Sequence, residues 1–493
     1  MNLALVSFLA YTGVLLAIGI WSYRIVEKVP IARYEEEFYT AGRGFGGVLV
    51  ALVIASGMAS AGTFIAGPGM TYAYGYSWVL INLTQTFLSL MLLAAVGIMV
   101  GLVARRVSVV TYLDIYRARY RSKAVVLLMA ALVTALLIPY MATQFVGAAR
   151  VIVQMTGLGY HAALALGSGV VLVYCVLGGM RGTAVATLLQ GVVITVGTVL
   201  LFAGTYQAAG GFERSTRALA ALDPKLLSPT GSGQSPWPFI VSIACLSGYF
   251  AAGSPHGMLG ALTYKNTLAL KRGIWLGAIL VFVWTLLLCT AGVMGRTLVS
   301  DLAAADEIAP WLAMEVLPGP LAGIVLAGIV AGIQTTVAAM AIVIASSIAK
   351  NVVQELGLEL TPRGMKTLSR ATVTACILAA IALALAQPPL VQWIILFALG
   401  GIGASAFAPI LLGMYWKRGN RWGALAAICS GMTLYVLGLT VVPEIGLFGM
   451  HPSFPSTVAA VLVYVLVSLA TPPPSEEVLR TFWGRAGQGD PAR

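Results

Sequence analysis

Long apolar stretches follow one another along almost the whole chain, separated by shorter polar ones. A helix needs about 20 apolar residues to cross the hydrocarbon core of a bilayer. Thirteen stretches reach that length, and we predict a transmembrane helix over each. They cover residues 3–24, 45–66, 76–104, 124–154, 160–179, 183–206, 238–262, 273–298, 315–349, 368–387, 391–416, 422–442 and 455–471. The pattern predicts an all-α integral membrane protein with thirteen transmembrane helices in a lipid bilayer.

Two of the predicted helices are interrupted by small residues, glycine and proline. The first interruption runs from Ala55 to Ser60 and continues into Gly-Pro-Gly at 67–69, and the second covers residues 248–256. Backbone groups freed inside hydrocarbon must be satisfied by protein, water or a ligand. Paired interruptions of this kind are typical of the central site of a secondary transporter. They favour a solute carrier.

The composition excludes a soluble protein, because 59% of the 493 residues are hydrophobic and only 9% are charged. The longest polar stretches are 207–237 and a short C-terminal tail. All five cysteines lie inside apolar stretches without paired spacing, which indicates packing residues and not disulfides or metal ligands. They are Cys175, Cys245, Cys289, Cys376 and Cys429.

The net charge of +12 raises the question of nucleic-acid binding, but its placement points to membrane topology. Lysine and arginine follow every odd-numbered predicted helix. The positive-inside rule then puts the N-terminus outside and the C-terminus in the cytoplasm of a cell bounded by a plasma (inner) membrane. An odd number of helices also requires the two ends of the chain to lie on opposite sides of the membrane, so the count and the charge agree. Arg150, part of the way into the fourth helix, either reaches back to the outer interface or draws an anionic solute inward.

The order of the predicted helices indicates two sets of five, at 45–206 and 238–416. Because each set has an odd number of helices and begins with an interrupted one, we predict an inverted-topology repeat with the site at its interface. A short amphipathic helix is expected at 108–122 on the cytoplasmic face. The other predicted parts are an extra helix and cytoplasmic loop (1–44), an external loop (207–237), two additional helices (417–471) and a cytoplasmic tail (472–493).

The membrane interior lacks carboxylates, since none of the seventeen acidic residues falls near the centre of a predicted helix. A proton relay would have to run through His256 alone. Sodium needs only carbonyl and hydroxyl oxygens, so the pattern favours sodium over protons. The ninth helix supplies two hydroxyls at Thr335 and Thr336. Such hydroxyls can also bond the carbonyl one turn back and bind nothing.

Several motifs resemble those of the sodium:solute symporter family, and the chain is most similar within it to the sodium/pantothenate symporters. They are ASGMASAGTFIAGPGMTYAYG at 55–75, ARYRS at 118–122, TQFVGAAR at 143–150, GGMR at 178–181, SPH at 254–256, SSIAK at 346–350 and MYWKRGNRWGAL at 414–425. The resemblance extends from about residue 6 to residue 470.

The resemblance implies the fold of the bacterial leucine transporter, with a five-plus-five inverted repeat and alternating access. It implies that sodium is the co-transported ion and that its gradient drives solute uptake. The sodium ligands that it implies are the carbonyl oxygens of Ala55, Met58 and Gly332 and the hydroxyls of Thr335 and Thr336.

Two positions depart from the family pattern. Many members carry aspartate three residues before a glutamine in the sixth helix, where this chain has Thr187 before Gln190. We therefore prefer one sodium per cycle. Pantothenate-like members tend to carry an arginine shortly after Pro-His, and none follows His256 here. This difference leaves monocarboxylates and proline open beside pantothenate.

We expect the solute, a small organic anion or zwitterion and foremost pantothenate, to lie between the two interruptions. The predicted contacts are Ser56, Ser60, Thr63, Trp78, Gln85, Tyr140, Gln144, Tyr249 and Ser254. A membrane sensor would need a signalling domain longer than the tail, and a passive channel would not need sodium. An enzyme is disfavoured because no catalytic constellation lies at membrane depth. No nucleic acid or obligatory protein partner is indicated.

Overall fold

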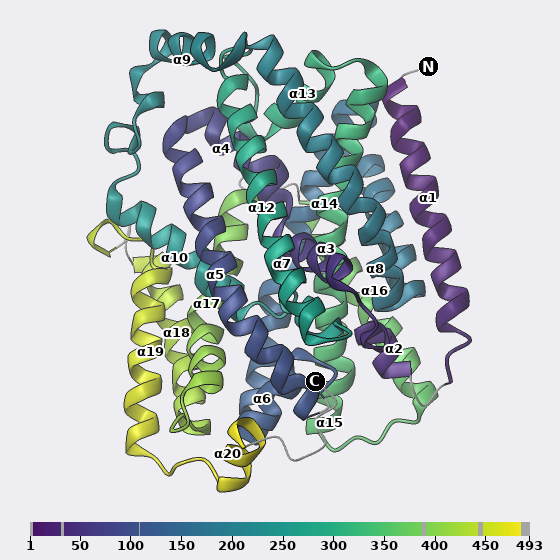
Figure 1. The fold of residues 1–493 in the computed structure, drawn as a ribbon, viewed down its shortest axis with the longest axis vertical. Coiled ribbons are helices and arrows are strands. Elements are labelled where there is room, and N and C mark those ends of the chain that lie inside the picture. The colour runs from purple at the N-terminus through teal and green to yellow at the C-terminus, as the bar shows by residue number, and fades with distance from the viewer. Residues whose placement is uncertain (1–2, 31–33, 108, 387–390, 442–446, 485–493) are drawn as a thin grey trace.

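The structure, a computed structural model, describes residues 3–30, 34–107, 109–386, 391–441 and 447–484 (Figure 1). The described residues form helices and connections and no sheet; two short segments meet in a single β-bridge between Phe45 and Tyr264. The long helices are α1 (Leu3–Val26), α5 (Tyr76–Arg106), α7 (Lys123–Thr156), α8 (Tyr160–Ala208), α12 (Thr267–Gly295), α14 (Gly319–Ser346), α16 (Pro362–Ala384), α17 (Val391–Tyr415), α18 (Arg421–Val441) and α19 (Ser453–Ala470).

Shorter helices join these or interrupt them. They are α2 (Tyr34–Thr40), α3 (Gly47–Met58), α4 (Gly67–Tyr74), α6 (Tyr112–Tyr120), α9 (Gly211–Leu222), α10 (Trp237–Gly253), α11 (Gly260–Thr263), α13 (Ile308–Val316), α15 (Val353–Glu355) and α20 (Glu476–Trp483). Three tighter or wider turns also matter for the site: η3 (Gly62–Ala66), η6 (Ala305–Glu307) and η7 (Ser347–Val352).

Among the described residues, eleven helical stretches are long and apolar enough to cross a membrane. The bent pair Gly47–Met58 and Gly62–Tyr74 would make a twelfth span, and α10 is an apolar helix of 17 residues. Each predicted span overlaps one of these segments. The chain is thus a multi-pass helical membrane protein as predicted, while the count of thirteen stays a prediction.

Helix α8 contains two of the predicted spans, because the chain reverses within it. A Cβ added to Gly182 would lie 3.5 Å from the carbonyl oxygen of Tyr174. Eight residues of straight helix would separate the two positions by about 12 Å. The stretches Tyr160–Leu177 and Gly182–Ala208 therefore lie side by side, as expected for consecutive spans.

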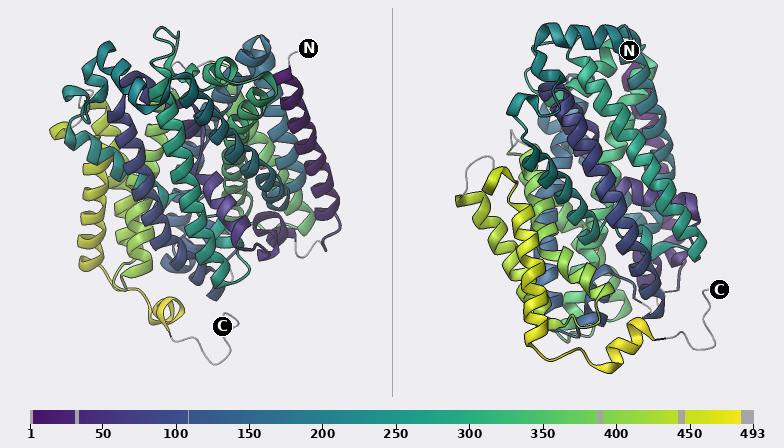
Figure 2. Two further views of the ribbon diagram at one scale, coloured as in Figure 1. Left: turned by 45° about the horizontal axis from the view of Figure 1, so that its top comes forward. Right: turned by 60° about the vertical axis from the view of Figure 1, so that its left-hand side comes forward.

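The start of α1 and helix α20 lie at opposite ends of the helical bundle (Figure 1). Helix α9 lies at the same end of the bundle as the start of α1. The opposite end, where α20 lies, also contains α2, α6 and α15. Helices α18 and α19 pack together at one side of the bundle (Figure 2). The segment 207–237, predicted as an external loop, contains the 12-residue helix α9, so it is more ordered than its glycine and serine content indicated.

Helix α6 confirms the predicted short helix, and most of its residues are buried against the rest of the bundle. Its tyrosines face the bundle, and Arg119 is only 1% exposed. The Arg119 guanidinium donates to the carbonyl oxygens of Gly413 (2.7 Å) and Gly419 (2.8 Å), and Trp483 of α20 lies over it. The predicted tail therefore contains a helix that packs against α6.

Asp114 links α6 to η7 (Ser347–Val352), the turn that follows α14. Its carboxylate accepts hydrogen bonds from the backbone N–H of Val110 and Thr111, from Lys350 Nζ (2.8 Å) and from Asn351 Nδ2 (2.7 Å). Burial opposes ionisation of this carboxyl, but the charge of Lys350 and these hydrogen bonds outweigh it and hold its pKa below the ordinary aspartate value.

Replacing Asp114→Ala should destabilise the protein by about 3–5 kcal/mol at neutral pH, because it leaves the partly buried Lys350 charge without its main partner. Because folding lowers the pKa, the wild-type contribution is complete above the pKa of an unfolded aspartate and is lost as the pH falls through the folded value. Thermal unfolding in detergent measures both effects. Glu213→Ala, which removes a pair that is 78–79% exposed, is the control. Equal melting temperatures for the two variants would contradict the prediction.

Candidate functional site

The first interruption lies at Ala59 and Ser60. Helix α3 ends at Met58, Ala59 is extended (φ −89°, ψ 128°), and the chain re-enters helical structure at η3. The two halves are bent by 68°. The predicted continuation of the interruption at residues 67–69 is wrong, because these residues open α4. Pro68 occupies its first turn, directly after the wide helical turn of η3.

The second interruption follows α10. Ser254 is extended, and helical structure resumes only at Gly260. The Ser254 hydroxyl accepts from Gly257 N (3.1 Å) and bonds His256 Nδ1 (3.2 Å). The two interruptions touch, because a Cβ added to Gly57 would lie 3.2 Å from the carbonyl oxygen of His256. Both predicted segments therefore contain a break, and the two breaks lie side by side. The predicted start of the second break at residue 248 is wrong, because residues 248–253 are the last turns of α10.

Carbonyl oxygens converge on the hydroxyl of Thr336, which is fully buried. Thr336 Oγ1 lies 3.0 Å from Ser56 O and 3.1 Å from Gly332 O, and it also contacts Ala59 O. A hydroxyl has one hydrogen and can donate it to one of these oxygens at a time. Gly332 O also accepts from Thr335, so Ser56 O and Ala59 O compete for the Thr336 hydrogen, and such a group of oxygens is a suitable environment for a hard cation.

The other predicted sodium ligands lie in the same turn or next to it. Thr335 Oγ1 bonds Gly332 O (2.9 Å), the one-turn-back arrangement that the sequence left open. Ala55 O accepts a helical bond from Ala59 N (2.8 Å). Of the three carbonyls in contact with Thr336, that of Gly332 is a predicted ligand, whereas those of Ser56 and Ala59 each follow a predicted one, Ala55 or Met58, by one residue.

Gly332 fits against an aromatic ring. A Cβ at this position would overlap the ring of Phe64 in η3. Phe64 is 1% exposed and also packs against Trp284 (ring centroids 6.2 Å apart). The first interrupted helix and α14 therefore meet at a place where only glycine leaves enough room.

A cavity of about 100 Å³ lies beside the first interruption. Four of the nine predicted solute contacts line it, together with the predicted sodium ligand Met58. The four are Ser60, Thr63, Gln85 and Tyr140. Sequence reasoning missed six further polar residues of the lining: Asn82, Thr86, Ser89, Ser247, Thr285 and Gln392. Three of the six recur with Gln85 at helical spacing along α5, at 82, 85, 86 and 89, and that stripe was a usable signal.

The other five predicted solute contacts do not line the cavity. Trp78 and Tyr249 pack against apolar or aromatic neighbours, Tyr249 with Phe407 at 4.6 Å between ring centroids. Gln144 Oε1 accepts from Ala61 N (2.7 Å) and so satisfies a backbone group freed by the first interruption. Ser56 bonds within α3, and Ser254 bonds within the second interruption.

The cavity has polar groups that are free to bind a solute. Gln85 Oε1 accepts from Ser247 (3.0 Å), whereas Gln85 Nε2 and Gln392 Oε1 are buried and have no hydrogen-bond partner in the described structure. Its described lining contains amides and hydroxyls and no ionised side chain. At about 30 Å³ per water, the volume suits roughly three waters, so a larger solute requires the lining to move.

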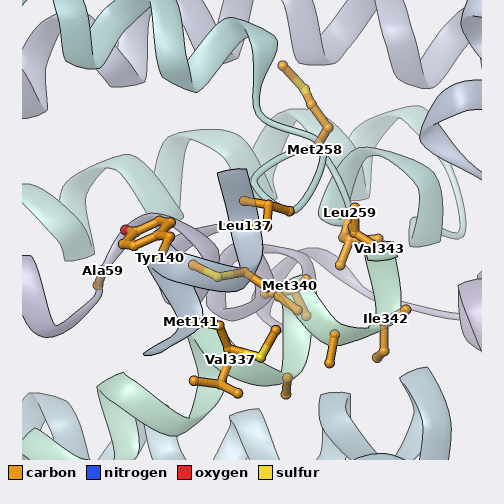
Figure 3. Packing of buried hydrophobic residues seen from close by; sticks show 14 of the residues in the cluster. Ala59, Leu137, Tyr140, Met141, Met258, Leu259, Val337, Met340, Ile342 and Val343 are labelled. Atoms are coloured by element: carbon orange, nitrogen blue, oxygen red, sulfur yellow. The ribbon is translucent and has the colours of Figure 1, made fainter. Parts of the chain in front are cut away.

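Apolar side chains fill the space on the Lys350 side of the two threonines. Figure 3 shows Leu137, Tyr140 and Met141 of α7 and Met340 of α14 near Ala59, with Met258 and Leu259 of the second interruption close by. All of these side chains are at most 5% exposed. Together these side chains form part of the buried apolar core next to α14.

On the opposite side, Arg150 forms an ion pair with Asp306 of η6 (Nη1–Oδ2 3.4 Å). A Cβ added to Gly69 would lie 2.8 Å from Asp306 Oδ1, so η6 also packs on α4. Burial raises the pKa of the Asp306 carboxyl, and the charge of Arg150 opposes that rise. Through Asp306 of η6, Arg150 therefore links α7 to α4, the second half of the first interrupted helix.

Comparison with known proteins agrees with this geometry. Residues 38–431 match the model of the sodium:solute symporter family. The sodium/pantothenate symporter of Escherichia coli (strain K12) is 32% identical over 96% of this chain and 98% of its own length. That of Haemophilus influenzae is 32% identical over 87% and 89%. An osmoregulated proline transporter of Bacillus subtilis is 24% identical over 97% of both chains.

Solved structures share the fold. A Na⁺-coupled sialic acid symporter in a substrate-bound outward-open state superposes with a TM-score of 0.82, covering 96% of this chain and 99% of its own, at 16% identity. A nucleobase-cation-symport-1 transporter in a closed conformation gives a TM-score of 0.56 at 14% identity, covering 90% and 97%. The predicted leucine-transporter-type fold is confirmed.

Replacing Gly332→Ala should destabilise the protein by about 1–3 kcal/mol, because the added methyl group overlaps the Phe64 ring in a packed interior. Gly13→Ala in α1 is the matched control, since a Cβ there meets nothing within 4 Å. Thermal unfolding in detergent should show a decrease in the melting temperature for Gly332→Ala and no decrease for Gly13→Ala. An unchanged melting temperature for Gly332→Ala would show that the Phe64 ring does not pack against Gly332 as described.

Proposed function

The chain belongs to the sodium:solute symporter family, and we propose that the solute it imports with sodium is pantothenate. It is a sodium-coupled symporter. The observation that carries the proposed mechanism is the convergence of three carbonyl oxygens and one hydroxyl at Thr336, directly beside a polar cavity. Ion and solute sites that share the first interrupted helix can bias the same conformation, which is what symport requires.

We propose that sodium binds at this oxygen cluster, with the hydroxyls of Thr335 and Thr336 and the carbonyl of Gly332 as ligands. The predicted carbonyls of Ala55 and Met58 lie in the same turn of α3 as the carbonyl that contacts Thr336. Rotation of the Thr336 hydroxyl turns its lone pairs toward the ion, while backbone oxygens need no change of protonation. The site therefore binds a monovalent cation without a carboxylate.

The amide and hydroxyl side chains that line the cavity suit an uncharged polar part of a solute. Amide and hydroxyl side chains both donate and accept, which suits the amide and hydroxyl groups of pantothenate. The relatives that align over most of both chains at 32% identity are also sodium/pantothenate symporters. Proline is the second candidate, because proline transporters align over equal lengths at 24–26% identity. Monocarboxylates remain a third class to test.

We propose that residues 45–206 and 238–416 form the two inverted repeats and that transport proceeds by alternating access. Contact between the two interruptions at Gly57 and His256 supports a site at the repeat interface. Basic residues such as Arg117, Lys350 and Lys366 lie at the C-terminal end of the bundle. This distribution supports a cytoplasmic C-terminus, an external N-terminus and residence in the plasma (inner) membrane.

Replacing both Thr335 and Thr336 by Ala should raise the half-saturating sodium concentration at least tenfold, because it removes two of the proposed ligands. Sodium-dependent uptake into proteoliposomes measures it. Replacing both by Ser, which keeps the hydroxyls, is the control and should restore sodium dependence close to that of the wild type. Unaltered sodium dependence of the double alanine variant would remove the site assignment.

Gln85→Leu should raise the half-saturating pantothenate concentration roughly twofold to tenfold, the effect of losing one neutral hydrogen bond. Thr84→Val is the matched control, since its hydroxyl bonds carbonyls within α5 and faces away from the cavity. Competition by unlabelled pantothenate, proline and short monocarboxylates for sodium-stimulated uptake identifies the solute. Preferential uptake of proline over pantothenate would reject our proposal for the solute and leave the sodium site intact.

A further inference from the structure

A buried hydrogen-bond network lies behind the two threonines. Tyr11 of α1 donates to the side-chain oxygen of Gln334 of α14 (3.0 Å). The amide nitrogen of Gln190 in α8 approaches both Tyr11 OH (3.4 Å) and Gln334 Oε1 (3.5 Å). Tyr174, also of α8, donates to the backbone oxygen of Gln334 (2.9 Å). Three residues of two helices, α1 and α8, therefore bind one residue of α14 through both its side chain and its backbone.

The position of Gln334 in α14 relates this network to the proposed sodium ligands. Gln334 immediately precedes Thr335 and lies two residues before Thr336. At 3.6 residues per turn, residues two apart point about 200° apart around the helix axis. Gln334 therefore holds the side of the turn that faces away from the first interrupted helix, while Thr336 contacts that helix. Because the turn is rigid, contacts that fix the direction of the Gln334 side chain also fix the direction in which Thr336 points.

Among the bonds to the Gln334 side chain, the one from Tyr11 has the best length. The contact from Gln190 Nε2 is at the limit of hydrogen bonding, so it is weaker. Gln334 and Tyr11 are 2% and 7% exposed, which leaves water little access to replace a lost donor. The orientation of the Gln334 side chain thus depends mainly on Tyr11.

Tyr11 lies outside residues 38–431, the part of the chain that matches the family model, and outside both proposed repeats. Its helix nevertheless packs closely on α14, since a Cβ added to Gly323 would overlap Ala4. We propose that Tyr11 is a positioning residue for sodium: through Gln334 it sets the rotation of the turn that presents Gly332, Thr335 and Thr336 to the ion. This inference rests on the sodium site proposed above.

Tyr11→Phe tests the proposal, because it removes the hydroxyl and keeps the ring. It should raise the half-saturating sodium concentration roughly twofold to tenfold, the effect of one lost neutral hydrogen bond. The maximal uptake rate and the half-saturating solute concentration at saturating sodium should stay unchanged. The matched control is Thr12→Val, which removes a neighbouring hydroxyl bonded only to Phe8 O of its own helix (2.9 Å).

Gln334→Met removes the acceptor at similar side-chain size and provides a second route to the same result. It should raise the sodium requirement as well, and Tyr11→Phe should add nothing further in that background. Additive effects, or a change for Tyr11→Phe no greater than for Thr12→Val, would overturn the proposal, as would a loss confined to protein abundance or maximal rate.

The outcome also separates this inference from the sodium site itself. If the double alanine variant of Thr335 and Thr336 alters sodium dependence and Tyr11→Phe does not, only the positioning role fails. If the double alanine variant leaves sodium dependence unchanged, the sodium site fails and the positioning role fails with it. Sodium binding to purified protein, followed by intrinsic tryptophan fluorescence, gives a second measurement independent of the transport rate.

Discussion

The structure depends on how backbone carbonyls are satisfied where a helix stops inside hydrocarbon. At the first interruption, Ser56 O and Ala59 O turn toward Thr336, whose single hydroxyl hydrogen cannot serve both together with Gly332 O. Gln144 satisfies the freed N–H of Ala61 on the other side of the same interruption. The chain thus supplies an acceptor for the freed N–H group but only one hydroxyl hydrogen for several oxygens, and this imbalance is what makes the place suited to a cation.

Close packing brings the parts of the site together. Glycines at the contacts let backbones approach within a distance that any side chain would prevent, as at Gly57 beside the second interruption and at Gly292 of α12, where a Cβ would overlap α4. The cavity and the oxygen cluster meet at consecutive residues, because Met58 and Ser60 line the cavity and Ala59 O contacts Thr336. The proposed ion and solute sites therefore share a few residues of the first interrupted helix, which gives the proposed coupling a structural basis.

The sequence was sufficient for the features that follow from length and hydropathy. Spans, both interruptions, the short helix at 112–120 and the fold class followed from apolar length, glycine and proline, and family motifs. The error at 67–69 arose because Gly-Pro-Gly both breaks a helix and begins one, and only the neighbouring turn decides between them. The burial of α6 was not predictable from its own residues, because its aromatic face packs on helices distant in sequence.

The solute contacts were the least predictable part. Polar residues near the interruptions were selected by type, and five of nine proved to pack or to satisfy backbone groups elsewhere. The stripe of α5 from Asn82 to Ser89 carried the needed periodic signal, whereas Ser247 and Gln392 are single polar residues in apolar helices. The bond between Tyr11 and Gln334 joins residues 323 positions apart, which no local pattern encodes.

The fit of the Phe64 ring against Gly332 limits how the two helices can move past each other. A ring seated in a notch resists sliding along the helix axis, since any displacement along that axis drives it into the side chains on either side. Tilting about the seated ring keeps the contact and costs little. This contact therefore favours a change of the angle between the two helices about the Phe64 ring over a translation of one helix along the other.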